Sequence, residues 1–421
     1  MTPSELRTLL DQRLPEPRRE LLEAVGRLAA QMGLPVYIVG GFVRDLLLDG
    51  EQAPGDFDFV VDGDAPALAR AVARELGGRV TVHAPFGTAT WFSALDDGAT
   101  IDFAMARTET YPQPAVLPRV TPATIDADLQ RRDFTINTLA LRVDGEHCGE
   151  LLDLHQAQAD LAARVIRVLH PLSFQDDPTR IFRAVRYTQR LDFQLTGETL
   201  ALIPEALTAL TLLTGERVRH ELELIFREPR ATAMLTVLEE WGVLQKVHPS
   251  LRWDARKSAL ASTTLPVADW KMDPAPEPEA FYLGLLLMEA APLEVARALT
   301  RLSVNREVSH AVQAAVSLVI EGGTRPSEVV ACLEGFSELA LAVAYVLHEA
   351  SRAHLNDYLA HWRFVQAETT GDDLIALGLT PGPQFKYILW ELRAACLDGQ
   401  VADRDGERVL IDKLVNEKLT G

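Results

Sequence analysis

The chain has 421 residues, a formal net charge of −19 at pH 7, and 48% hydrophobic residues. This length is sufficient for two to four domains with substantial cores. The acidic net charge argues against non-specific binding of nucleic acid over the whole surface, but it is compatible with a local basic patch. The three cysteines are far apart and odd in number, which argues against a disulfide framework.

The sequence predicts a cytoplasmic protein that has no contact with a membrane. Its amino-terminal segment is polar and charged, and no apolar run reaches the length that crosses a bilayer. No feature of the sequence indicates a protein partner.

The first segment with chemical character begins with a short strand. Val36 to Val39 is apolar and mostly β-branched, and the glycines Gly40 and Gly41 end it in a turn at which the backbone can approach a phosphate closely. A helical stretch with Arg44 near its start is expected to follow.

A second strand is predicted at residues 56–61, where acidic and aromatic residues alternate. A period of two places Asp56 and Asp58 on one face and Phe57 and Phe59 on the other. Two neighbouring carboxylates are costly unless cations neutralise them, and hard oxygen ligands favour Mg²⁺. An acid pair taken alone is more often a solvated strand face, but the glycine turn and the nearby arginine favour the metal site.

This layout resembles the nucleotidyltransferase superfamily that includes DNA polymerase β, whose signature is a glycine turn followed by an acid pair on a strand. The resemblance implies that Asp56 and Asp58 hold Mg²⁺. It also implies a third catalytic acid on a neighbouring strand, and Asp102, which has apolar residues on both sides, is the candidate.

Three further motifs follow in order within the first 230 residues: Asp128 to Asn137 (DLQRRDFTIN), His170 to Phe193 (HPLSFQDDPTRIFRAVRYTQRLDF) and Glu216 to Glu221 (ERVRHE). They are similar to the RRDFTxN, EDxxR and ERxxxE elements of class II tRNA nucleotidyltransferases and bacterial poly(A) polymerases. One departure is Asp176, at a position where the family commonly has Glu. Together with the acid pair, the motifs form a far more specific signal than the acid pair alone.

Four arginines recur every three or four residues on a helix expected to begin near Pro178: Arg180, Arg183, Arg186 and Arg190. From the residues alone, such a stripe is either a salt-bridged surface or a site for a triphosphate or an RNA backbone. The resemblance favours the second interpretation and implies a nucleotide site that includes Gly40, Gly41, Arg44, Arg132, Arg183 and Arg186.

The resemblance gives Asp177 and Arg180 a separate role. In the family, the matching Asp and Arg bind the Watson–Crick edge of the incoming base, so that protein selects the nucleotide. A carboxylate accepts from the exocyclic amine of cytosine or adenine, whereas uracil and guanine present a carbonyl there. Alternatively, Asp177 is an acid at a helix N-terminus that the helix dipole stabilises.

The expected architecture is a polymerase β-like α/β nucleotidyltransferase head followed by an all-helical region. We expect the head at residues 1–145, a helical neck with the arginine helix at residues 146–250, and a helical body and tail that binds tRNA at residues 251–421. Short strands and helices mix before about residue 145, and apolar residues at helical spacing dominate after it.

The resemblance therefore implies template-independent addition of C, of A or of both nucleotides, from CTP and ATP, to the 3′ end of tRNA. The Pro-rich segment at residues 107–120 resembles the version in some CCA-adding and A-adding members, which favours inclusion of the terminal A. Partial CC or A addition and poly(A) synthesis are the alternatives within the family. Outside it, the alternatives are a small-molecule nucleotidyltransferase and a non-catalytic RNA-binding protein.

Overall fold

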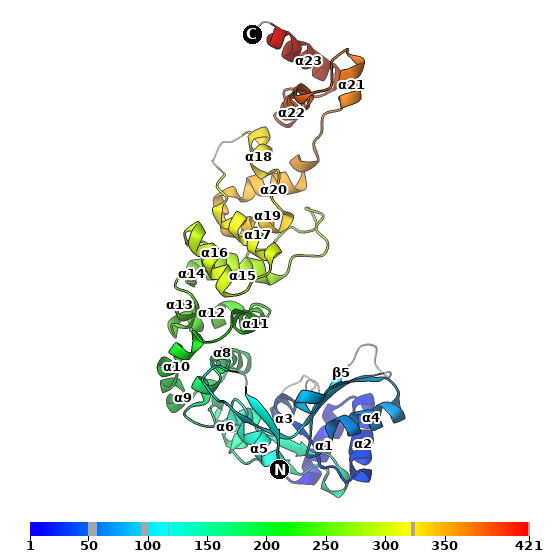
Figure 1. Ribbon diagram of the computed structural model, residues 1–421, viewed down its shortest axis with the longest axis vertical. Helices are drawn as coiled ribbons and strands as arrows, with labels where there is room; N and C mark the ends of the chain where they lie inside the picture. The colour runs from blue at the N-terminus through cyan, green and yellow to red at the C-terminus, as the bar shows by residue number, and fades with distance from the viewer. Residues whose placement is uncertain (49–56, 94–99, 117, 321–324, 420–421) are drawn as a thin grey trace. The chain divides into compact units, whose positions relative to one another are not determined.

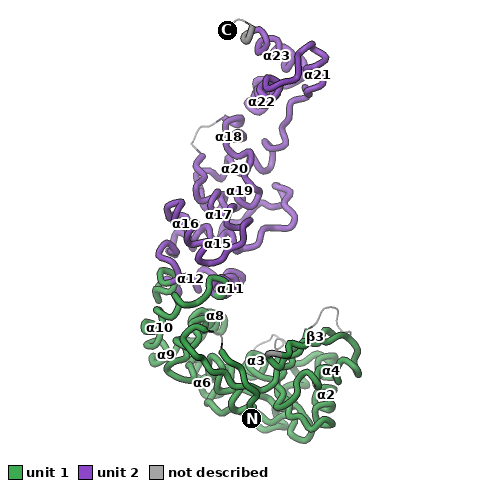
Figure 2. The backbone as a smooth tube through the Cα atoms, in the orientation of Figure 1, with its two compact units in different colours: residues 1–217, 240–246 green, residues 218–239, 247–421 purple. Residues whose placement is uncertain are grey.

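The structure is a computed structural model that describes residues 1–48, 57–93, 100–116, 118–320 and 325–419. The chain divides into two compact units (Figure 2). The first comprises residues 1–217 and 240–246, and the second comprises residues 218–239 and 247–421. The three-part division expected from the sequence stays a prediction.

A mixed sheet lies in the first unit (Figure 1). Within the described residues its strand order is β3-β4-β5-β2-β1-β8-β9. All neighbours in it are antiparallel except β2 and β5, which run parallel. The strands are β1 (Val36–Val39), β2 (Asp58–Val61), β3 (Arg79–His83), β4 (Thr88–Phe92), β5 (Thr100–Met105), β8 (Ala140–Arg142) and β9 (Leu151–Leu152). A parallel pair requires a crossover connection, which α4 (Ala65–Leu76) provides together with β3 and β4.

One face of this sheet is covered by helices. Asp64 caps the N-terminus of α4 by accepting a 2.9 Å hydrogen bond from the amide of Ala67. Helix α4 packs on β3, β4 and β5, and α2 (Glu16–Gln31) packs on α4. The rings of Phe59 and Phe103 stack beneath these helices with centroids 5.1 Å apart. The opposite face carries the acids of β2 and β5, and beside them a buried apolar cluster that includes Tyr37, Val39, Val60 and Ala140.

A separate hairpin of β6 (Arg107–Thr110) and β7 (Arg119–Pro122) follows the sheet strand β5. Beyond it, the first unit is mainly helical, with a short parallel pair of β10 (Val165–Ile166) and β11 (Gln194–Leu195). Its other helices are α1 (Pro3–Arg13), α3 (Gly41–Leu47), α5 (Ile125–Gln130), α6 (Ala157–Ala163), α7 (Ser173–Asp176), α8 (Thr179–Leu191), α9 (Gly197–Ala201) and α10 (Ile203–Leu210). The boundary between the units falls within α11 (Gly215–Phe226), α12 (Ala231–Glu240) and α13 (Val243–Val247).

The described residues of the second unit form helices and contain no strand. These helices are α14 (Ala255–Leu260), α15 (Pro278–Leu287), α16 (Pro292–Arg301), α17 (Arg306–Ser317), α18 (Pro326–Leu333), α19 (Glu338–Leu347), α20 (Arg352–Ala360), α21 (Gly371–Ala376), α22 (Pro383–Leu397) and α23 (Arg404–Leu419). A small apolar core joins α21, α22 and α23. The predicted fold class, an α/β head followed by a helical region, is confirmed.

In the ranges that the structure describes, no single helix is long and apolar enough to cross a membrane. The bent pair of α18 and α19, which turns by 117°, passes the same criteria of length and composition when its two helices are taken together.

Candidate active site

Two of the predicted catalytic acids lie side by side on the sheet face opposite Phe59 and Phe103. The parallel register of β2 and β5 pairs Asp58 with Asp102, and β4 places Thr90 opposite Asp102. Both acids are exposed, whereas the aromatic residue that follows each of them is buried. The predicted alternation in β2 is thus confirmed for Asp58, while Asp56 lies outside the described residues.

The donor chemistry of this acid row suits a hard divalent cation. Neighbouring strands lie about 4.8 Å apart, so that in-register carboxylates can share one ion. The hydroxyl of Thr90 donates a 2.6 Å hydrogen bond to Oδ1 of Asp102, which orients that carboxylate. No group of three His, Cys, Asp or Glu side chains gathers for a metal within the described residues, a set that leaves out Asp56.

The glycine turn joins β1 directly to α3. Gly40 has φ 71°, in the left-handed region that glycine adopts without strain, and its amide donates to the carbonyl of Leu139 at 3.1 Å. A Cβ at position 40 would lie 3.2 Å from Nη1 of Arg132. The turn therefore provides space for an arginine of the RRDFTxN motif, and Gly41 begins α3.

Arg44, on α3, is only 3% exposed. Its guanidinium donates at 2.8 Å to Oδ1 of Asn137 and at 2.8 Å to Oδ1 of Asp45, and it lies 5.2 Å from the ring centre of Tyr187. Arg183 lies 5.6 Å from the same ring centre. Two of the arginines predicted to bind triphosphate therefore lie near the same aromatic ring. Arg44 comes from the helix after the glycine turn, and Arg183 comes from the arginine helix α8.

Asp133 links the RRDFTxN motif to the arginine helix, a role that sequence reasoning missed. Its carboxylate accepts hydrogen bonds from the amide of Phe134 at 2.8 Å and from Nδ2 of Asn137 at 2.9 Å, and it pairs with Arg183 at 2.6 Å. Burial alone would raise the pKa of Asp133, but Arg183 and these hydrogen bonds outweigh it and lower the pKa. Asp133 is therefore ionised and fixes Arg183. Its position beside the two arginines of the motif is the signal that could have identified it.

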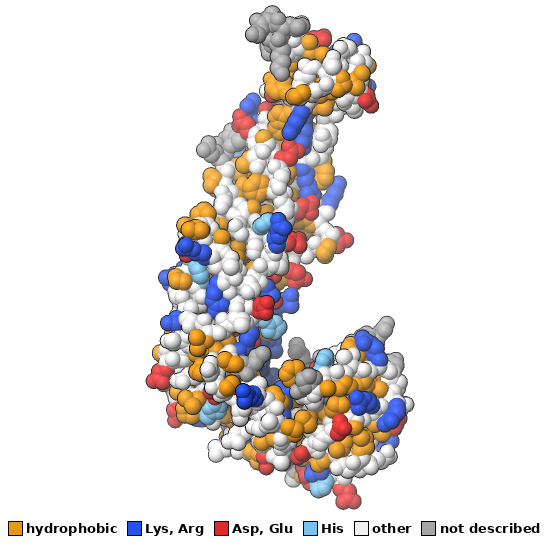
Figure 3. All heavy atoms as spheres, viewed as in Figure 1, with side chains coloured by type: hydrophobic (Ala, Val, Ile, Leu, Met, Phe, Trp, Pro, Cys, Tyr) orange, Lys and Arg blue, Asp and Glu red, His pale blue; other side chains and the backbone are white. Residues whose placement is uncertain are grey.

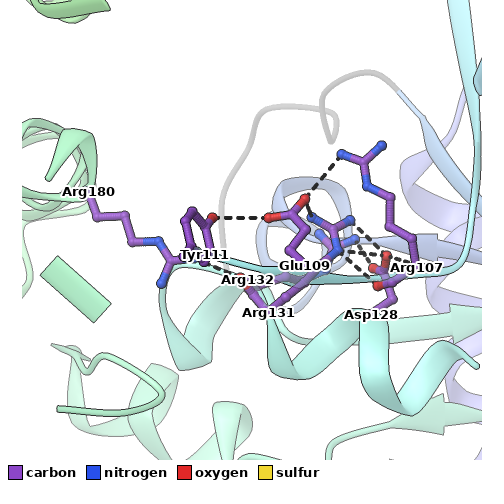
Figure 4. Close-up of polar contacts among 7 residues, drawn as sticks. All are labelled: Arg107, Glu109, Tyr111, Asp128, Arg131, Arg132 and Arg180. Atoms are coloured by element: carbon purple, nitrogen blue, oxygen red, sulfur yellow. Dashed lines mark hydrogen bonds and ion pairs between the residues drawn. The ribbon is translucent and has the colours of Figure 1, made fainter. Parts of the chain in front are cut away.

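Arg131 and Arg132 share one buried carboxylate, that of Asp128 (Figure 4). Nη2 of Arg131 lies 2.7 Å from Oδ1 of Asp128, and Nη2 of Arg132 lies 3.0 Å from Oδ2. Arg132, which is predicted to bind triphosphate, is therefore held in place by an acid four residues earlier.

Residues of the β6–β7 hairpin contact the same motif (Figure 4). Glu109 accepts from Nη1 of Arg131 at 2.8 Å, from Nη2 of Arg107 at 3.3 Å and from the phenol of Tyr111 at 3.1 Å. Burial, together with the carboxylate of Glu109, raises the pKa of Tyr111 to about 12. The phenol consequently stays protonated and acts as a donor at neutral pH.

The two predicted base-reading residues flank the start of α8, which begins at Thr179 next to the expected Pro178. Arg180 is 5% exposed, and its Nη2 donates to the carbonyl of Arg131 at 2.8 Å. Oδ1 of Asp177 accepts from Nη2 of Arg217 at 2.8 Å. Further along α8, Arg186 is half-buried and Arg190 is exposed.

Comparison with known proteins places this arrangement in a class. Residues 36–167 match the family model described as the poly A polymerase head domain. Residues 192–254 match the model described as a probable RNA and SrmB-binding site of polymerase A. The fold and these matches define a polymerase β-like nucleotidyltransferase, and that class typically uses divalent metals.

Individual relatives narrow the class. An A-adding tRNA nucleotidyltransferase of Geobacter sulfurreducens is 37% identical over 97% of this chain and 48% of its own length. A CC-adding tRNA nucleotidyltransferase of Deinococcus radiodurans is 32% identical over 89% of this chain and 88% of its own. The structure of a Thermotoga maritima CCA-adding enzyme complexed with tRNA matches with a TM-score of 0.77 and 27% identity over 98% of both chains.

The chain belongs to the tRNA nucleotidyltransferase family, as its sequence motifs predicted. It spans about half the length of the Geobacter A-adding relative, so its similarity to that protein concerns only part of it.

Proposed function

We propose that the chain adds nucleotides from CTP and ATP to the 3′ end of tRNA without a nucleic-acid template, the terminal A included. The observation that carries this proposal is the pairing of the exposed Asp58 and Asp102 across β2 and β5, within residues 36–167, which match the poly A polymerase head model. Exposed carboxylates in one row suit nucleotidyl transfer, because they can hold divalent cations where a triphosphate can reach them. The cations then neutralise the negative charge of the triphosphate.

The metal proposed for this row is Mg²⁺, which Asp56 and Asp58 would hold, and Asp102 is the proposed third catalytic acid. Bound there, Mg²⁺ supplies a lowered pKa at the RNA 3′-hydroxyl and neutralises charge on the triphosphate and the leaving pyrophosphate. The chain's own contribution is to present the carboxylates on a rigid sheet and to fix Asp102 through Thr90.

The proposed triphosphate site consists of Gly40, Gly41, Arg44, Arg132, Arg183 and Arg186. Three of these arginines are already paired with protein groups, namely Arg44 with Asn137, Arg132 with Asp128 and Arg183 with Asp133. Such pairs hold the guanidinium groups in one orientation, so less conformational freedom is lost when an anion binds.

Asp177 and Arg180 are the proposed base-reading residues. A carboxylate at Asp177 accepts a hydrogen bond from the amine of cytosine or adenine, and it is left unpaired against the carbonyl of uracil or guanine. Inclusion of the terminal A is favoured because the A-adding relative is more similar in sequence than the CC-adding one. CC addition is the second candidate, because the chain covers most of the CC-adding relative's length.

The deciding experiment supplies labelled CTP and ATP with Mg²⁺ to three transcripts of one tRNA, ending before CCA, after the first C, and after CC. We expect the transcript that ends in CC to gain one A. Completion of all three ends would identify full CCA addition, and C addition alone would identify the CC-adding alternative. Long A tracts on unrelated RNA, or no incorporation into any transcript, would overturn the proposal.

A further inference from the structure

Arg217 belongs to the ERxxxE motif and has no role in the site proposed so far. It lies in the first turn of α11, where the positive end of the helix dipole disfavours a cation. A neighbouring carboxylate offsets this effect, because Nη2 of Arg217 lies 2.8 Å from Oδ1 of Asp177. The two residues are 40 positions apart, so the pair is a product of the tertiary fold.

The same guanidinium makes a second contact, with the connection between β6 and β7. Its Nη1 donates to the carbonyl of Ala115 at 2.9 Å. The amide of Ala115 in turn donates to the carbonyl of Asp176 at 3.2 Å. Arg217 is therefore held on both sides, and its fork cannot turn away from Asp177 without breaking the contact with the hairpin.

One oxygen of the Asp177 carboxylate receives every hydrogen bond that this group makes with the described residues. Oδ1 accepts from Arg217, from the amide of Thr179 at 3.1 Å and from the hydroxyl of Thr179 at 2.7 Å. Three donors on one oxygen fix the rotation of the carboxylate and leave Oδ2 to accept from a ligand. The side chains of Asp177 and Arg217 are 22% and 25% exposed, so a ligand can reach the pair.

We infer that Arg217 is a positioning residue that holds Asp177 for nucleobase selection and thereby sets the preference for ATP and CTP over GTP and UTP. This inference rests on the proposed function, in which Asp177 reads the base. Arg217 acts through Asp177 and needs no contact with the nucleotide. Without it, the carboxylate can rotate and accept other hydrogen-bonding patterns, so discrimination falls even where transfer of the correct nucleotide continues.

The test uses the full chain with Arg217→Gln and Arg217→Lys. Single-nucleotide incorporation into a CC-ended tRNA transcript gives kcat and KM for each of the four nucleotides, and equilibrium binding of the same nucleotides gives a readout apart from turnover. For Arg217→Gln we expect the kcat/KM ratio of ATP over GTP to fall by about tenfold, which corresponds to about 1.4 kcal/mol, the scale of a charge-assisted hydrogen bond. Arg217→Lys restores part of the ratio, because it keeps the charge but not the fork.

Arg164→Gln is the matched control, since Arg164 forms an exposed pair with Asp192 at 3.2 Å within the same unit. An equal loss with all four nucleotides, or an unchanged ratio in both Arg217 variants, overturns the inference. If Arg217→Gln does not fold, as judged by circular dichroism, Thr179→Val decides, because it removes another donor to the same oxygen and should lower the ratio too. If the wild-type chain incorporates no nucleotide, the proposed function itself is overturned. This outcome distinguishes failure of the proposed function from failure of the inference about Arg217.

Discussion

At the residue scale, the side chains of the candidate site are ordered chiefly by acids that do not belong to the predicted site. Asp128 orders Arg131 and Arg132, and Asp133 orders Arg183. Buried carboxylates of this kind persist only when they are paired and hydrogen-bonded. The arginines are thus fixed before any anion arrives.

Asp58→Ala should reduce nucleotide incorporation by at least about a thousandfold, because it removes a carboxylate from the proposed metal site. The fold should remain, since Asp58 is exposed at the start of β2. Initial rates of AMP incorporation and thermal unfolding measure the two effects. Asp62→Asn, just past the other end of β2, serves as the control and should retain activity. Normal turnover by Asp58→Ala would remove this residue from the site.

Asp133→Asn should lower the free energy of unfolding by about 2 kcal/mol at neutral pH, because it unpairs Arg183 and weakens three hydrogen bonds. The folded-state pKa of Asp133 lies below its ordinary value of 3.8. Its stabilising contribution is therefore fully present above pH 3.8 and is lost as the pH falls through the lower, folded-state pKa. The difference in Tm between wild type and variant should accordingly shrink below pH 3.8, and a difference that stays constant down to pH 2 would contradict this account.

Alternation alone predicted which face of β2 carries Asp58, because a period of two is a local property of the backbone. The resemblance implied a neighbouring strand for Asp102, but local spacing could not predict the register that sets it beside Asp58, since the two acids are 44 positions apart (102 − 58). The pairing of Arg217 with Asp177 escaped sequence reasoning for the same reason. Short-range spacing could identify Asp128 as the partner of Arg131 and Arg132, whereas the partners Asp133 of Arg183 and Arg217 of Asp177 follow only from the tertiary structure.

At the scale of elements, the Pro-rich segment at residues 107–120 supplies β6 and the start of β7, which pair as a hairpin. Its two ends pair as β6 and β7 over four residues each. In β6, charged residues alternate with threonine, and β7 also contains β-branched residues, which favour strands. Prolines in the connecting stretch are compatible with pairing at the ends alone. Glu109 then fastens the hairpin to the RRDFTxN motif.

Glu109→Gln should loosen this hairpin by about 1 to 2 kcal/mol, because a neutral amide replaces a carboxylate that accepts from two arginines and a phenol. Hydrogen exchange of the backbone amides in β6 and β7 measures the change, which should be confined to that region. Glu150→Gln, which alters an exposed carboxylate paired with His147, provides the control. Unchanged protection in Glu109→Gln would show that backbone pairing alone holds the hairpin.

The helices α21 to α23 depend on one buried acid. Glu407 is 2% exposed and accepts from the amide of Glu368 at 2.8 Å, and from the amide and hydroxyl of Thr369 at 2.7 and 2.6 Å. Glu407→Ala should destabilise these helices by about 2 to 3 kcal/mol, since it leaves the buried amide of Thr369 without its acceptor. Faster hydrogen exchange in α22 would report this, whereas Glu391→Gln on that helix should leave exchange unaltered.

At the scale of the whole molecule, the net charge is −19, although 41 lysines and arginines are distributed along the chain. On the visible face of both units, basic and acidic side chains are interspersed (Figure 3). The chain contains no lysine before Lys246, so the permanent cations of residues 1–245 are arginines apart from the N-terminus. Phosphate contacts in the head would therefore be made by guanidinium forks.

The affinity for tRNA should depend less on salt concentration than is usual for a nucleic-acid-binding protein. With contacts to about three to five phosphates, the slope of log K against log salt concentration should lie at about −2 to −4. Fluorescence anisotropy of a labelled tRNA between 50 and 300 mM KCl measures this slope. A value near −10 would indicate an extended basic surface, which the composition argues against.

The sequence predicted the change from an α/β head to a helical region, because strand and helix periodicities differ over windows of ten residues or more. The expected boundaries after residues 145 and 250 stay predictions. The boundary between the two compact units falls inside α11, α12 and α13, and a single helix carries no local mark of such a division.

The strand that carries Thr90 also carries a natural fluorophore. Trp91 is fully buried on the opposite face of β4 and donates from Nε1 to the carbonyl of Gly77 at 2.8 Å, while its neighbour Thr90 holds Asp102. The other five tryptophans of the chain all lie beyond residue 240. A variant that keeps only Trp91 would therefore let its emission follow changes at the acid row through one strand, without an added label.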